Sequence, residues 1–384
     1  FADPGTPPDP VVVDAWTHGD ALFRVNAGGP ELPAADSGVS WAEDRVAAGA
    51  GGTATTGVAS AQLDPDYAAQ ANGEKKAYGT ADPVVAGPTV PAGVPAELLQ
   101  LERWDPPTGL DLGYDFAVPA GELVEVRVYL AEVFQTGTPP TPRVFDILLD
   151  GVVVADDVNP LADHGHDVGF MLPFVVESDG TIDVDFAHVS ENPAVKGVEV
   201  VALVAAADAE SGDDVAFVAH LVNPASNTAD ATVDAVGLSV DGGAATDVSA
   251  GCSPAIGATI APGGLVECRF TATVAGAADN VVDHVVETST SFSSGETGVA
   301  AESDGVAITI VEPPPPASTV RINTGGTSTV AATDGGPEWE ADDPHASLSV
   351  PSGSSLGSFP VGGRHGSLPG HVPQDVCQSE RWDG

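Results

Sequence analysis

The chain is poor in basic residues. Of its 384 residues, 12 are Lys or Arg and 56 are Asp or Glu, so its formal net charge is -44. Proteins that bind nucleic acids neutralise phosphates with Lys and Arg, and anionic membrane surfaces attract the same side chains. The shortage of basic residues therefore excludes a general nucleic-acid partner and argues against attachment to anionic membranes.

Long hydrophobic runs and aromatic residues are also scarce. The longest apolar run, residues 200–207, is far shorter than the ~18 residues of a membrane-spanning helix, so we expect no membrane insertion. Aromatic residues make up 5% of the chain and Met occurs once, whereas Gly occurs 45 times and Pro 33 times. This composition favours short strands and turns over long helices, and a hydrophobic content of 42% is enough for packed cores. We therefore expect an all-β protein.

The sequence repeats in part. RVNAGG at residues 24–29 recurs as RINTGG at 321–326, and ERWD at 102–105 recurs at 380–383. Matches in the same order indicate that one kind of module begins near residue 21 and restarts near 320.

Alternating side chains predict β-strands in the first module. Residues 123–130 alternate between apolar and charged side chains, with Glu125 on the polar face, as in a half-buried strand. Residues 144–155 contain two apolar runs around the dipeptide DG at 150–151, which tolerates the positive φ of a tight hairpin turn. Such runs are typical of two packed antiparallel sheets.

Five motifs of the first module carry a family resemblance. They are RVNAGG at 24–29, ERW at 102–104, LAEVF at 130–134, RVFD at 143–146 and ENPAVKGVEV at 191–200. In this order they resemble the malectin family. The resemblance covers residues 21–204 and, in part, 320–384, and it implies a β-sandwich related to carbohydrate-binding domains.

Residues 208–312 contain the segments CSP at 252–254 and IAPGGLVEC at 260–268. With these segments the stretch resembles the Ig-like repeats of prokaryotic surface proteins. Cys252 and Cys268 within it are placed for a disulfide that stabilises the fold by roughly 3 kcal/mol, with two buried thiols as the alternative. A disulfide implies an oxidising, extracellular compartment. Cys377 is left over, and we expect it to be a buried, unpaired thiol.

The chain thus reads as tandem β-sandwich modules joined by Pro-rich linkers. The prolines of residues 313–319 predict a stiff polyproline spacer. We expect a linker or the end of a preceding domain at 1–20, a malectin-like sandwich at 21–204, an Ig-like sandwich at 208–312, the linker at 313–319, and the N-terminal part of a second malectin-like domain at 320–384.

No motif of the chain points to catalysis. The segment DHGHD at 163–167 offers imidazole and carboxylate groups, which bind metal ions, and a polar surface loop is the alternative reading. The paired acids Asp156 and Asp157 are expected in solvent. We expect no enzyme activity, no catalytic residue, no cofactor and no metal site, and we leave the 163–167 segment open.

Sugar binding is the site hypothesis that the resemblance supports. Aromatic faces pack on the apolar patches of sugar rings, and carboxylates accept hydrogen bonds from hydroxyls. Carried over from the family's motifs, Tyr78, Phe134 and Glu191 are the carbohydrate-binding candidates. Leu99 and Gln135 stand where sugar-binding members place other contacts, so the site departs from the family pattern there.

Three further polar residues of the motifs are expected to support the fold. Arg103, Arg143 and Asp146 are predicted to form buried hydrogen bonds or ion pairs rather than ligand contacts.

Two functions remain, and both place the chain outside the cell, at the cell surface. The first is a non-enzymatic segment of a long, repetitive surface protein that serves adhesion or forms filaments, its partners being copies of itself or further modules of the same chain. Residues 320–384 hold only part of a module, so we expect either further chain or an adjacent subunit to complete it, and completion by an adjacent subunit would give head-to-tail growth. The alternative is an active lectin that binds cell-surface or extracellular glycans. The acidic composition also predicts a halophilic protein, because salt screens the repulsion between carboxylates.

Overall fold

The computed structural model describes most of the first 312 residues and four short strands beyond them. The described residues are 7–34, 38–46, 61–63, 76–106, 110–135, 142–312, 321–323, 339–341, 355–358 and 379–382. The chain divides into two compact units, Phe1–Glu312 and Pro313–Gly384. Nearly all of the described secondary structure is β-strand, so the predicted all-β class is confirmed. The described helical turns are α2 (Pro160–His164), η2 (Ala96–Gln100) and η3 (Ser249–Gly251).

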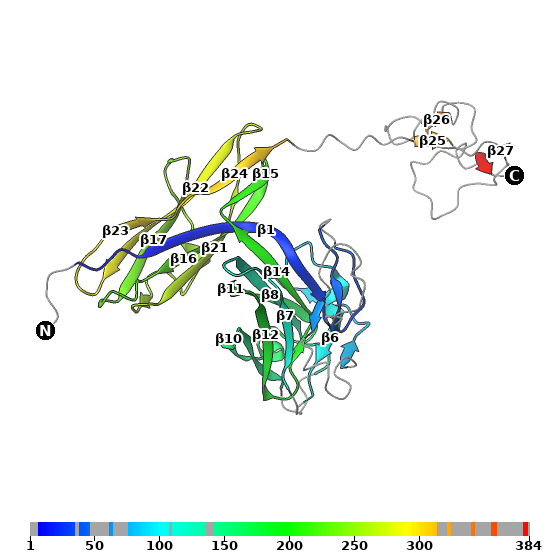
Figure 1. Cartoon of the computed structure of the whole chain (residues 1–384), viewed down its shortest axis with the longest axis horizontal. Coiled ribbons are helices and arrows are strands. Elements are labelled where there is room, and N and C mark those ends of the chain that lie inside the picture. The colour runs from blue at the N-terminus through cyan, green and yellow to red at the C-terminus, as the bar shows by residue number, and fades with distance from the viewer. Residues whose placement is uncertain are drawn as a thin grey trace. The chain divides into compact units, whose positions relative to one another are not determined.

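The first sandwich is built on one continuous path of hydrogen-bonded strands (Figure 1). Its strands are β1 (Val12–Asn26), β2 (Ala42–Val46), β3 (Ala61–Leu63), β4 (Ala77–Gly79), β5 (Val85–Ala86), β6 (Leu101–Trp104), β7 (Leu112–Phe116), β8 (Leu123–Ala131), β9 (Val144–Leu149), β10 (Val152–Val158), β11 (Val168–Glu177), β12 (Ile182–Ser190), β13 (Ala194–Val195) and β14 (Gly197–Val204). The path runs β10-β9-β12-β7-β3-β2-β1-β14-β8-β11-β5, and β13, β6 and β4 form a small separate sheet.

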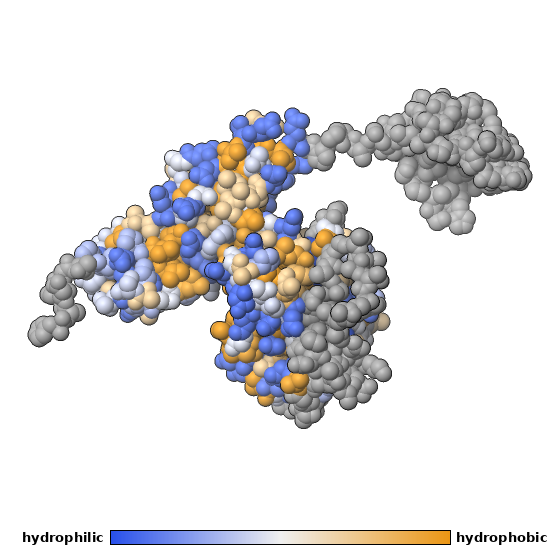
Figure 2. Space-filling model, in the orientation of Figure 1, coloured by the Kyte–Doolittle hydropathy of each residue, from blue (hydrophilic) through white to orange (hydrophobic). Residues whose placement is uncertain are grey.

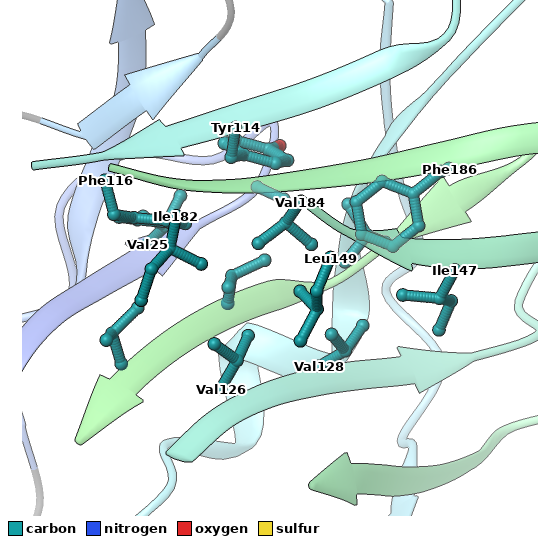
Figure 3. Packing of buried hydrophobic residues seen from close by; sticks show 14 of the residues in the cluster. Val25, Tyr114, Phe116, Val126, Val128, Ile147, Leu149, Ile182, Val184 and Phe186 are labelled. Atoms are coloured by element: carbon teal, nitrogen blue, oxygen red, sulfur yellow. The ribbon is translucent and has the colours of Figure 1, made fainter. Parts of the chain in front are cut away.

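The two ends of this path enclose one hydrophobic core. Val126 and Val128 of β8 lie opposite Ile147 of β9 and Val184 and Phe186 of β12 (Figure 3), and all five side chains are fully buried. Burying a side chain of this kind stabilises the fold by about 1.5–3 kcal/mol. The alternation of apolar residues in these strands therefore supplies the main packing energy of the sandwich.

The hairpin predicted at residues 144–155 is confirmed. Strands β9 and β10 pair antiparallel, and the turn between them is Asp150-Gly151. The φ angles are 50° at Asp150 and 74° at Gly151. A two-residue turn with both φ angles positive matches the right-handed twist of the strands that it joins.

The outer face of β8 differs from the prediction. Glu125, expected on a polar face, is only 1% exposed. Its carboxylate contacts His18 Nε2 at 3.1 Å, Arg127 Nε at 2.5 Å and the guanidinium of Arg269 from the second sandwich. Burial raises the pKa of Glu125, but the bond from His18 and the charge of Arg127 more than reverse this effect, so the pKa lies well below its ordinary value. The polar face of β8, which would be exposed to solvent in the first sandwich alone, is thus partly covered by the second sandwich.

The second sandwich fills the remainder of unit 1 (Figure 1). Its strands are β15 (Ala206–Glu210), β16 (Asp214–Val222), β17 (Ala231–Val240), β18 (Thr246–Asp247), β19 (Cys252–Ser253), β20 (Thr259–Ile260), β21 (Leu265–Thr273), β22 (Val281–Phe292), β23 (Val299–Glu302) and β24 (Val306–Val311). One sheet contains β16, β21 and β19, and the other contains β15-β24-β22-β17-β18 with β20 and β23. Phe217, Leu221 and Ile308 lie in the core between them. A disulfide between Cys252 and Cys268 joins β19 to β21.

Strand β1 belongs to both sandwiches. Val12–Thr17 pair with β16, whereas Thr17–Asn26 pair with β14. The expected linker or preceding domain at 1–20 is therefore corrected for residues 12–20, which are part of this strand. The physical reason is that Val13 and Ala15, two positions apart on one face of the strand, bury their side chains in the core of the second sandwich.

The described strands of unit 2 repeat two pairings of the first sandwich. β25 (Arg321–Asn323) runs parallel to β26 (Trp339–Ala341), as β1 runs parallel to β2. β27 (Ser355–Ser358) is antiparallel to β28 (Ser379–Trp382), as β4 is to β6. The predicted spacer at 313–319 and Cys377 lie outside the described residues.

Candidate functional site

Two of the predicted sugar-binding residues lie together. Tyr78 in β4 and Phe134, just after β8, have ring centroids 5.2 Å apart with an interplanar angle of 80°. The exposed fractions are 37% for Tyr78 and 59% for Phe134, and no other Phe, Trp or Tyr side chain described in residues 7–312 is exposed. The fold therefore brings two distant segments together as one exposed aromatic pair.

The surrounding surface makes this pair distinct. The face of unit 1 seen in Figure 2 mixes hydrophilic and hydrophobic residues without a clear division. Apart from the aromatic pair, the large exposed apolar side chains described are Val and Leu, such as Val85 and Val152. Single exposed aliphatic side chains are normal on protein surfaces, whereas two exposed aromatic rings in contact are not.

Backbone pairing and a buried carboxylate position the two rings. Tyr78 pairs with Glu102 of β6 in the small sheet. On the Phe134 side, Glu132 Oε1 accepts hydrogen bonds from the backbone N–H groups of Phe134 and Gln135, each at 2.8 Å. Each ring is therefore attached to backbone that hydrogen bonds hold in place.

A buried network of charges connects these two supports. Lys196 Nζ lies 2.8 Å from Glu102 Oε2, and Arg143 Nη2 lies 3.5 Å from Glu102 Oε1. Arg143 Nε lies 3.0 Å from Glu132 Oε2. The network of Glu102, Glu132, Arg143 and Lys196, called here the buried charge network, contains two acids and two bases, so its formal charges cancel. It links the partner of Tyr78 to the carboxylate that holds the Phe134 loop.

The charge of Lys196 depends on its acidic partner. Burial lowers the pKa of Lys196, and the attraction of Glu102 opposes only part of this effect. Glu102, Glu132 and Lys196 stand inside the sequence motifs, but sequence reasoning did not assign them a role. A Lys between apolar residues at 194–198 is the signal that could have found the network, because an unpaired buried charge is very costly.

Two of the three residues predicted to support the fold do so in the interior. Arg103 pairs with Asp44 through two of its nitrogens, and Arg143 belongs to the buried charge network. Asp146 is only half-buried and accepts a hydrogen bond from the backbone of Asp157 at 2.8 Å. Its role is thus to support the β9–β10 hairpin.

The third sugar-binding candidate, Glu191, lies in the loop between β12 and β13. It is half-buried and has a φ of 60°, in the left-handed region. The contacts found among the described residues join Tyr78 to Phe134 but do not include Glu191.

Leu99 is buried in η2 and packs so closely that a Cβ on Gly169 would lie 2.6 Å from its Cδ1. Position 99 therefore faces the interior rather than a ligand.

A further aromatic residue lies in the strand next to Tyr78. Trp104 of β6 is half-buried, and Lys76 Nζ lies 5.0 Å from the centroid of its ring. The backbone N–H of Trp104 also donates a hydrogen bond to the backbone carbonyl oxygen of Lys76 at 2.9 Å. Sequence reasoning used Trp104 only as part of a motif.

The histidines at 163–167 make separate contacts. His164 stacks on Phe170 with ring centroids 3.7 Å apart, and His166 Nδ1 lies 2.8 Å from Asp167 Oδ2. Within the described residues, this segment does not appear among the groups of three ligating side chains; those groups are Asp105, Asp111 and His188, and Asp146, Asp156 and Asp157.

Comparison with known proteins finds a family match over the first sandwich. Residues 21–208 match the family model described as Malectin domain. No curated protein matches the chain. Similar solved structures include the ANXUR1 extracellular domain from Arabidopsis thaliana, with 15% identity over 48% of this chain and 48% of that chain and a TM-score of 0.35. The plant receptor-like kinase FER has 18% identity, coverages of 48% and 50%, and a TM-score of 0.36.

A bacterial enzyme is also among the similar structures. The β-glucuronidase of Bacteroides uniformis has 17% identity over 46% of this chain but only 18% of its own, with a TM-score of 0.33. The chain thus spans half or less of the length of each of these proteins. Among the described residues, no helix has the length and hydropathy needed to cross a membrane.

Proposed function

We propose that residues 21–204, within the part that matches the malectin family, form a non-catalytic carbohydrate-binding module in an adhesive extracellular surface protein. The observation that carries the proposal is the exposed pair of Tyr78 and Phe134. Aromatic faces pack against the C–H groups of sugar rings, and two rings set at a steep angle offer a face and an edge to one ligand.

Preorganisation supports this proposal. An aromatic side chain binds more tightly when its position is fixed before the ligand arrives, because less conformational entropy is lost on binding. The buried charge network fixes the backbone that carries both rings without contacting the ligand itself. We assign Glu191, on the neighbouring loop, the role of accepting hydrogen bonds from sugar hydroxyls.

The disulfide supports an extracellular location. Disulfides persist in oxidising compartments and are rare in reducing ones, and Cys252 and Cys268 are joined in the second sandwich. The net charge of -44 also suits a protein that stays soluble in a salty medium.

A glycan array probed with the full chain tests carbohydrate binding, followed by calorimetry on the best ligand. We expect Y78A and F134A each to weaken binding about two- to tenfold, which corresponds to the ~0.5–1.5 kcal/mol of an aromatic contact. V152A, which shortens an exposed side chain in β10, is the matched control and should bind as the wild type does. E191Q separately tests the role assigned to the Glu191 carboxylate, which is to accept hydrogen bonds from sugar hydroxyls.

Either of two results would contradict the proposal. One is an array without binding at millimolar ligand. The other is a ligand whose affinity is the same for Y78A, F134A and the wild type.

A purely structural role is the second candidate, and the repeated strand register favours it. Ile322 pairs with Glu340 as Val25 pairs with Ala42, so the repeat extends from sequence to strand pairing. Sedimentation of the full chain tests self-association through this repeat. Polymers that grow with concentration and disappear when residues 313–384 are deleted support it, whereas a monomer at all concentrations contradicts it.

A further inference from the structure

One buried carboxylate in the first sandwich is unlike the others. Among the described residues, the buried acids are Asp44, Glu102, Asp105, Glu125, Glu132 and Glu199. Five of these six form an ion pair with Arg or Lys. Asp105 does not, and its titratable neighbours are His188 and Asp111. A buried carboxylate without a cation is costly, so this exception calls for a partner.

The Asp105 carboxylate has unused bonding capacity. Its side chain is 0% exposed, and Oδ2 accepts a hydrogen bond from the backbone N–H of Leu112 at 3.0 Å. Oδ1 is buried and has no hydrogen-bond partner. His188 Nε2 is likewise buried without a hydrogen bond and lies 3.6 Å from Asp105 Oδ2. Each of these two side chains therefore has an unsatisfied ligand atom, and the two side chains approach each other within 3.6 Å.

Asp111 sets the tautomer of the histidine. Its Oδ1 lies 2.9 Å from His188 Nδ1, close enough to accept a hydrogen bond from that nitrogen. A proton on Nδ1 leaves the lone pair of Nε2 directed toward Asp105. The carboxylate–histidine pair is the usual arrangement behind a metal-bound imidazole, because it orients the ring and raises its basicity.

We infer that Asp105, Asp111 and His188 form a binding site for a divalent transition-metal ion of the Zn²⁺ class. The ligand atoms of the three residues lie within 4.8 Å of one another. Ligands bound at about 2.0–2.1 Å to one tetrahedral zinc are separated by about 3.4 Å, close to the 3.6 Å between Nε2 and Oδ2. Asp105 and His188 bind the ion directly, and Asp111 orients the imidazole.

Charge and ligand type both favour this class of ion. Two carboxylates and a neutral imidazole carry a formal charge of −2, which one dication cancels. Imidazole suits zinc and similar metals, whereas calcium and magnesium prefer oxygen ligands alone. The side chain of Asp111 is 46% exposed, which gives water and the ion access from solvent.

The site joins three strands of the sandwich. Asp105 directly follows β6, Asp111 directly precedes β7, and His188 lies in β12, which pairs with β7. A bound ion therefore fixes the connection between β6 and β7 against β12. This inference does not depend on carbohydrate binding.

Calorimetric titration of the full chain with Zn²⁺ at pH 7, after removal of metal with EDTA, tests the site. All variants are made on a C377S background, because a free thiol binds zinc itself. D105N and H188Q each remove a direct ligand and should lower the affinity by at least thirtyfold. D111N removes the orienting group and should lower it by about 10–100-fold.

D156N is the matched control for nonspecific binding to acidic groups. Asp156 belongs to the exposed cluster with Asp146 and Asp157, so its removal should leave the zinc affinity of the inferred site unchanged. Circular dichroism verifies that each variant is folded. The inference is overturned if the C377S chain fails to bind Zn²⁺ below millimolar concentration, or if D105N and H188Q both bind as it does. Binding of Ca²⁺ as tight as that of Zn²⁺ would refute the assigned class of metal.

Discussion

Replacing Lys196 with Met removes one charge from the buried charge network and leaves Glu102 without its nearest cation. The side chains of Lys196 and Glu102 are 1% and 2% exposed, so neither can turn to solvent when the other is lost. Removing one partner of a buried ion pair costs about 3–5 kcal/mol. Because Arg143 remains 3.5 Å from Glu102, we expect K196M to lie near the lower limit, at about 3 kcal/mol.

Replacing Glu102, alone and together with Lys196, completes a double-mutant cycle on this ion pair. E102Q leaves the ammonium of Lys196 with a neutral acceptor and should cost about 2 kcal/mol. The double variant K196M/E102Q leaves neither charge uncompensated, so it should cost about 2–3 kcal/mol rather than the sum of the two, a coupling free energy of about 2–3 kcal/mol.

Urea denaturation of the full chain, followed by far-UV circular dichroism, measures these free energies. The free energy of unfolding should fall with urea concentration at the same slope in all four proteins, since the surface exposed on unfolding is unchanged. Single variants within 0.5 kcal/mol of the wild type would refute the reasoning. So would additivity in the double variant, because it would mean that the two side chains do not compensate each other.

Four further outcomes are expected. The pKa of Glu125 is depressed in the fold, so the unfolded chain takes up more protons as the pH falls below about 4.5; stability measured by urea denaturation should fall there, and less steeply in E125Q. R269M removes one of the cations of Glu125 and should cost about 1–2 kcal/mol in the same assay, less than a fully buried pair because Arg269 is 27% exposed; a loss below 0.3 kcal/mol would contradict this. The thermal midpoint should rise from low to molar salt, and a flat or falling midpoint would argue against salt adaptation. Thiol labelling under denaturing, non-reducing conditions should find one thiol per chain, Cys377, because Cys252 and Cys268 are bonded; three thiols would contradict the disulfide.

Local features of the fold were accessible from sequence because short-range physics determines them. The turn at Asp150-Gly151 depends on two residues that tolerate positive φ, and the apolar face of β8 follows from a period of two. The other face of β8 was not accessible, since what covers Glu125 includes Arg269, which is 144 positions away along the chain. No sequence pattern around Glu125 predicts a contact with a residue so distant along the chain.

In the candidate site, too, some features follow from the sequence and others arise only when distant segments meet in the fold. The resemblance supplied Tyr78 and Phe134, but their contact arises only when β4 and the end of β8 meet in space. At position 99 the resemblance showed only a departure from the family pattern, and it did not show that the Leu99 side chain packs inward beside Gly169. The pairing of Lys196 with Glu102 spans 94 positions and depends on burial, which composition does not reveal.

The shared strand has a mechanical consequence. When the chain is pulled by its ends, tension enters unit 1 through β1 and leaves it through β24. Residues 206–210 of β15 pair in parallel with residues 307–311 of β24, so a force along β24 slides the two strands past each other and loads all their hydrogen bonds at once. The pairing of β1 with β16 is loaded in the same shearing direction. Hydrogen bonds that share a load break together rather than in sequence, so we expect unit 1 to resist a pull along these strands more strongly than a pull that opens the same pairings one bond at a time.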